Sequence, residues 1–105
     1  IQVGRYTKIG NSIRFDVTVD YTGHTGAGAM KISGLPYAHG STGGCIAAVY
    51  AGNLTVPAGQ TPIARIASGS QTVDIYSLST NGSADATPLA MDASGTIIIS
   101  GEYRV

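Results

Sequence analysis

The chain has 105 residues, enough for one domain, with zero formal net charge and only 11% charged residues, against roughly 25% in an average soluble domain. Zero net charge excludes the basic surface of a nucleic-acid or anionic-membrane binder, and the 43% hydrophobic content excludes a disordered chain. The single cysteine, Cys45, leaves no internal disulfide, and no Cys/His spacing predicts a zinc site, so we expect neither metal nor cofactor.

The clearest pattern lies between Ser12 and Tyr21, where apolar and polar side chains alternate strictly. This period of two predicts a half-buried β-strand over Ser12–Tyr21. The preceding Gln2–Ile9 is also β-compatible, and Gly10 and Asn11 between the two segments tolerate the positive φ angles of a tight turn. The first quarter of the chain is therefore predicted to be a hairpin.

Short β-compatible segments separated by Gly, Pro and Asn continue to the end of the chain. The further predicted strands are Ala29–Ser33, Cys45–Tyr50, Pro62–Ala67, Thr72–Ser79 and Thr96–Arg104. Turn signals every 8–12 residues favour an antiparallel β-sandwich, jelly-roll-like, with about seven to eight strands. We expect a single domain over residues 1–105, and the start at Ile1 suggests a fragment of a longer chain; the resemblance described below implies its C-terminal part.

Few residues suggest catalysis. Asp16 and Asp20 share one strand face, but four residues at about 3.3 Å each separate them by roughly 13 Å, too far for paired catalytic carboxylates at about 5–9.5 Å. The small apolar neighbours of Cys45 favour a buried, inert thiol. We therefore expect no catalytic residue in this chain and assign no enzyme activity to it.

The loop at residues 37–41 is the best candidate for ligand contact. Tyr37 offers an aromatic platform, His39 a hydrogen-bonding imidazole and Ser41 a hydroxyl, a combination suited to a glycan. Core packing of the tyrosine and simple exposure of the histidine are the competing interpretations. The sequence predicts a glycan site formed by these three residues.

The run Ile97-Ile98-Ile99 is apolar on both faces of its strand. One face should meet something beyond the core of its own chain, and a neighbouring subunit would cover it. We therefore predict Ile97, Ile99 and Tyr103 as interface residues of a homo-oligomer.

Four sequence segments carry a resemblance to a known family. They are residues 4–11 (GRYTKIGN), 32–37 (ISGLPY), 52–59 (GNLTVPAG) and 95–103 (GTIIISGEY). In this order they resemble the C-terminal β-domain of tail fibres and tailspikes of tailed bacteriophages, over nearly the whole chain. The resemblance rests mainly on turns around glycines and on hydrophobic strands.

The resemblance implies a trimeric jelly roll at the distal end of a fibre, exposed on the virion at the host surface. Its partners would be two further copies and bacterial surface polysaccharide, without membrane insertion. It transfers no catalytic residue, since polysaccharide cleavage by tailspikes usually belongs to a separate β-helical domain. The alternative function is a monomeric carbohydrate-binding module appended to a bacterial polysaccharide-active enzyme, which the absence of tryptophan disfavours.

Overall fold

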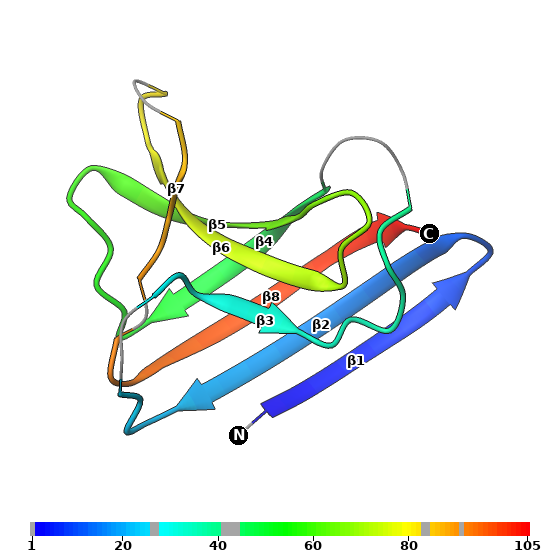
Figure 1. Ribbon diagram of the computed structural model, residues 1–105, viewed down its shortest axis with the longest axis horizontal. Helices are drawn as coiled ribbons and strands as arrows, with labels where there is room; N and C mark the ends of the chain where they lie inside the picture. Colours follow the sequence, from blue (N-terminus) through cyan, green and yellow to red (C-terminus); the bar gives the residue numbers. More distant parts are fainter. Residues whose placement is uncertain (1, 26–27, 41–44, 83–84, 91) are drawn as a thin grey trace.

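The computed structural model describes residues 2–25, 28–40, 45–82, 85–90 and 92–105, which form an all-β fold (Figure 1). The strands are β1 (Gln2–Ile9), β2 (Ser12–Tyr21), β3 (Lys31–Ser33), β4 (Cys45–Gly52), β5 (Gln60–Ile66), β6 (Thr72–Ser79), β7 (Thr87–Pro88) and β8 (Gly95–Arg104). All of them pair antiparallel. The described residues contain no helix, so the predicted all-β class is confirmed.

The sheet is strongly curled because one strand belongs to both of its halves. The strand order is β1-β2-β8-β4-β5-β6-β3, with β7 added beside β6. Residues 45–47 of β4 pair with β5, whereas residues 48–52 pair with β8. Strand β4 therefore connects two layers, and β3 and β6 lie over β8 and β2 as in a sandwich or half-barrel (Figure 1).

Small residues permit the close approach of strands where β4 changes partner. A Cβ atom added at Gly101 of β8 would lie only 2.8 Å from the Cβ of Ala47. Ala47 in turn pairs with Ala64 of β5, and both alanines are buried. A larger side chain at any of these three positions would push the layers apart.

The hairpin forms as predicted, and the later strands differ mainly at their ends. Gly10 has a φ of 61°, as a glycine-first two-residue hairpin turn requires. Strand β5 begins at Gln60, two residues before the predicted start at Pro62. Its pairing with β4 covers only residues 64–66, so Pro62 faces no ladder partner on that side and its missing N–H is tolerated.

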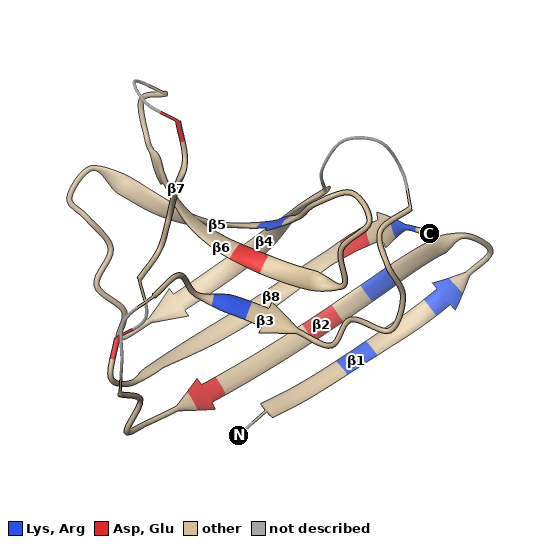
Figure 2. Cartoon of the chain, in the orientation of Figure 1, with Lys and Arg blue, Asp and Glu red and all other residues tan. Residues whose placement is uncertain are grey.

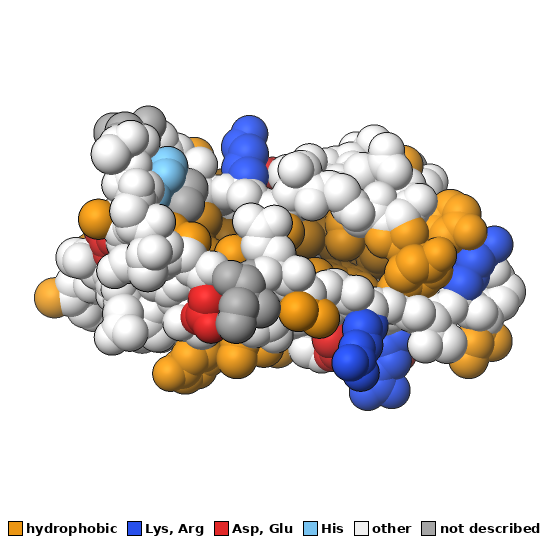
Figure 3. All heavy atoms as spheres, turned by 90° about the horizontal axis from the view of Figure 1, so that it is seen from below, with side chains coloured by type: hydrophobic (Ala, Val, Ile, Leu, Met, Phe, Trp, Pro, Cys, Tyr) orange, Lys and Arg blue, Asp and Glu red, His pale blue; other side chains and the backbone are white. Residues whose placement is uncertain are grey.

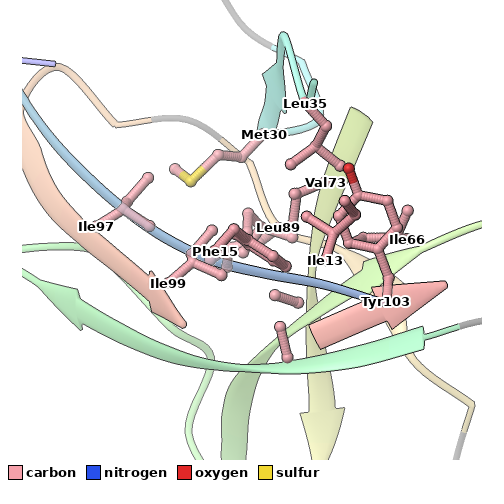
Figure 4. Packing of buried hydrophobic residues seen from close by; sticks show 13 residues of the cluster. Ile13, Phe15, Met30, Leu35, Ile66, Val73, Leu89, Ile97, Ile99 and Tyr103 are labelled. Carbon is pink, nitrogen blue, oxygen red and sulfur yellow. The ribbon is translucent and has the colours of Figure 1, made fainter. Parts of the chain in front are cut away.

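The core lies between the two layers and draws residues from nearly every long strand (Figure 4). Its buried members are Ile13, Phe15, Met30, Leu35, Ala47, Ala64, Ile66, Val73, Ile75, Leu89, Ile97, Ile99 and Tyr103. On β2 and β8 the buried residues occupy odd positions. The register places these positions on one face of the sheet, since Ile13 pairs with Tyr103 and Val17 with Ile99. The even positions of both strands consequently form the outer face of the sheet.

Candidate functional site

The curled sheet does not close, and a groove separates β1 and β2 from β3 and the loop after it. The groove has a volume of about 350 Å³. Phe15, Val17 and Leu35 line it, while Gln2 and Ser33 add polar groups from the two strand edges. Figure 3 shows hydrophobic side chains in the hollow between the two layers. The groove thus combines an apolar floor with a polar rim.

Strand β1 forms one wall of this groove and is exposed along its whole length. Its only partner in the described chain is β2. The two-residue turn makes Ile9 and Ser12 a hydrogen-bonded pair, so the backbone groups of even-numbered β1 residues point away from β2. The wall therefore offers free N–H and C=O groups to a ligand.

Two tyrosines and a lysine meet at one end of the groove, and we call these three residues the aromatic corner. Tyr6 on β1 and Tyr37 in the loop after β3 have ring centroids 6.3 Å apart and planes inclined at 82°. The Nζ of Lys8 lies 5.1 Å from the centroid of the Tyr37 ring. Tyr6 is 53% and Tyr37 39% exposed, so both rings are accessible.

The loop that carries Tyr37 is held firmly to the core. The buried hydroxyl of Tyr103 donates to the Tyr37 carbonyl at 2.8 Å, and the Tyr37 N–H donates to the hydroxyl oxygen of Tyr103 at 3.3 Å. Further along, the His39 N–H donates to the Ser70 carbonyl and the Gly40 N–H to the Arg104 carbonyl. Because burial removes the Tyr103 hydroxyl from water, its pKa is raised above the ordinary value of 10.0.

The predicted glycan site is corrected at His39. This side chain is only 4% exposed; its Nδ1 lies 2.9 Å from the Arg104 carbonyl, and its ring contacts that of Tyr103 edge-on. A ligand cannot reach the imidazole, because it packs inside the loop. Ser41 lies outside the described residues, so Tyr37 is the predicted residue that the structure places at an accessible surface.

The predicted interface residues are also corrected. Ile97, Ile99 and Tyr103 are at most 3% exposed and belong to the core of their own chain (Figure 4). The alternation of β8 turns the residue between the two isoleucines outward, and Ile98 is 42% exposed. Any contact of this run with a partner chain would therefore pass through Ile98.

A stripe of apolar side chains crosses the outer face at Ile98. Val3, Thr18, Ile98 and Tyr50 are consecutive cross-strand neighbours on β1, β2, β8 and β4. Val3 is 46% and Tyr50 60% exposed. We refer to these four residues as the outer stripe. The alternation within each strand is visible in the sequence, but the alignment of the four residues across the sheet depends on the strand order.

Two aspartates of β2 and the cysteine have local partners. On the outer face, the Ser100 hydroxyl donates to Asp16 and the Thr96 hydroxyl to Asp20. The thiol of Cys45 is half-buried rather than buried and donates to the Glu102 carbonyl at 2.6 Å. Burial raises the pKa of this thiol, which disfavours the nucleophilic thiolate at neutral pH.

The residues described contain no group of three or more His, Cys, Asp or Glu able to hold a metal ion. The described part of the chain contains no helix that is long and apolar enough to cross a membrane. A scan against protein-family models, a search of curated proteins and a search of solved structures each gave no match.

Proposed function

We propose that this chain is the trimerising C-terminal domain of a phage tail fibre or tailspike, exposed on the virion and in contact with host-surface glycans. The sequence resemblance motivates the family, and the outer stripe is the structural observation that supports self-association. Its large side chains Val3, Ile98 and Tyr50 are all more than 40% exposed. Contacts between copies would cover them.

Burying the stripe is favourable for two physical reasons. Apolar surface removed from water contributes about 25 cal/mol per Å². Ala48 beside the stripe is uncharged, and Asp16 and Asp20 on either side of Thr18 accept hydrogen bonds from Ser100 and Thr96, which lowers the cost of removing these carboxylates from water. Three-fold closure would also cover the free edge of β1, a strand otherwise prone to uncontrolled pairing.

The test is a charge placed in the middle of the stripe. Ile98→Lys puts an ammonium between Thr18 and Tyr50, on a face that also carries Asp16 and Asp20, so the fold should tolerate it. We expect the trimer to dissociate to monomers by light scattering, with an unchanged circular dichroism spectrum. Ile46→Lys, at a 63% exposed isoleucine of β4 outside the stripe, is the matched control. Equal trimer stability in both variants would contradict the assignment of the interface.

A monomeric carbohydrate-binding module on a bacterial polysaccharide-active enzyme is the second candidate. The aromatic corner favours it, since exposed tyrosine rings at a groove suit a sugar without any need for a partner chain. The two candidates differ in the mass of the domain in solution. A monomer that binds glycan would support the module.

A further inference from the structure

We infer that the aromatic corner binds a saccharide residue carrying a carboxylate, with the rest of the saccharide chain lying in the adjoining groove. This inference deepens the glycan contact of the proposed function and is independent of trimer formation. It identifies both the residues that replace the predicted His39 and Ser41 and the chemical class of the ligand.

The first step concerns shape. Tyr6 and Lys8 are two residues apart on β1 and therefore project on the same side of the sheet. Tyr37 approaches them from the opposite wall, and its ring meets Tyr6 edge-on. Tyr6 is 53% and Tyr37 39% exposed, so part of each ring stays accessible, and a pyranose ring can stack its C–H groups there while its hydroxyls remain in water.

The second step concerns rigidity. The Tyr37 backbone is fixed through its N–H and C=O to the buried hydroxyl of Tyr103. The corner is thus formed before a ligand arrives, and binding does not have to order the loop. If the loop of Tyr37 were loosely attached, binding would have to order it, and this entropic cost would lower the affinity for the ligand.

The third step concerns charge. On the inner face, β2 contributes Phe15 and Val17 beside Tyr6, and residues 34–37 of the facing loop are uncharged. Asp16 lies opposite Arg5 on the outer face, and Glu102 projects to that same outer face. Figure 2 shows Lys and Arg on β1 and both acidic and basic residues on β2. Because the cross-strand partner of Lys8 is the apolar Ile13, Lys8 is the charge that the described residues of β1, β2 and the facing loop present at the corner, and it selects an anionic ligand.

The fourth step concerns continuity. The groove begins at Tyr6 and runs past Gln2 and Ser33. Its apolar floor and polar rim match a saccharide, which has hydrophobic ring faces and hydroxyl edges. The free backbone groups of β1 at Gly4 and Gln2 supply further donors and acceptors. A chain of several sugar residues is therefore a better match to the groove than one monosaccharide.

The probe is a hexuronic acid tetrasaccharide, compared with the same oligosaccharide after reduction of its carboxyl groups. Titration calorimetry on the wild-type domain should show saturable binding of the uronate that is at least tenfold tighter than binding of the neutral form. Lys8→Gln should remove this preference, and Tyr37→Ala should abolish binding of both forms. Ile46→Ala removes a 63% exposed side chain from β4, outside both the aromatic corner and the outer stripe, and should leave binding unchanged.

Several outcomes would overturn the inference. They are equal affinity for the charged and neutral forms, an undiminished preference in Lys8→Gln, or no binding of either form by a folded domain. Loss of binding in Ile46→Ala as well would place the site elsewhere. Failure to bind by a stable trimer would reject the site and leave the assembly proposal intact, whereas binding by a permanent monomer would do the reverse.

Discussion

The hydroxyl of Tyr103 binds both backbone groups of Tyr37, donating to the carbonyl at 2.8 Å and meeting the N–H at 3.3 Å. The two residues are 66 positions apart. This contact attaches the exposed loop after β3 to the last strand of the core. Tyr103 thereby connects core packing directly to the accessible aromatic corner.

Removal of that hydroxyl should destabilise the domain. Tyr103→Phe keeps the buried ring but leaves two backbone groups of Tyr37 without this partner, which costs about 1–3 kcal/mol. Urea unfolding should show a lower midpoint with an unchanged slope. Tyr76→Phe removes a hydroxyl from a half-buried ring of β6, outside the outer stripe, and should have no effect. Equal midpoints for the two variants would show that the Tyr103 contact contributes nothing.

The close approach of β8 to β4 gives a second prediction. Gly101→Ala would place its Cβ 2.8 Å from that of Ala47, and the resulting overpacking should lower the free energy of unfolding by about 1–3 kcal/mol. The matched control is Gly4→Ala, whose Cβ would meet nothing closer than 3.9 Å. That change should alter the free energy by less than about 1 kcal/mol. A stable Gly101→Ala domain would mean that the layers separate more easily than the packing indicates.

Alkaline pH should weaken the fold. Burial raises the pKa values of Cys45, Tyr21 and Tyr103 above their ordinary values of 9.0 for the thiol and 10.0 for the phenols. The folded state then holds these protons more tightly than the unfolded state. Their stabilising contribution is complete below the unfolded pKa and is lost as the pH rises through the folded pKa.

The measurement is urea unfolding at several pH values between 8 and about 11, together with ultraviolet titration of the tyrosines. We expect the free energy of unfolding to decline above about pH 9, and a late phase of tyrosinate formation that disappears in the Tyr21→Phe, Tyr103→Phe double variant. A flat or rising stability over this range would contradict the burial of these groups.

Much of the fold could be predicted from local patterns, because hydrophobic alternation and turn residues act over a few positions. The Ser12–Tyr21 strand and its hairpin illustrate this, since burial of every second residue and the positive φ of Gly10 are both local. The strand β7 could not be predicted. Its two residues, Thr87 and Pro88, lie in a polar segment and form a strand only by pairing with β6.

The candidate site was harder to predict because its geometry depends on distant pairings. A histidine among glycines suggests an exposed loop, but His39 is buried by a contact with Arg104, 65 positions away. The isoleucine run predicted that one face of its strand contacts something outside the core, but the sequence does not show which residue faces outward. That answer came from the register of β8 between β2 and β4, which leaves Ile98 exposed. Lys8 and Tyr37 likewise meet only after the sheet has curled.

The measurement that tests the central claim most directly is the absolute mass of the domain in solution, by light scattering on a sizing column at several concentrations. The proposed assembly function predicts a mass three times the 10.6 kDa of the chain, maintained on dilution into the low micromolar range. A mass equal to one chain at every concentration would contradict trimerisation and favour the monomeric carbohydrate-binding module.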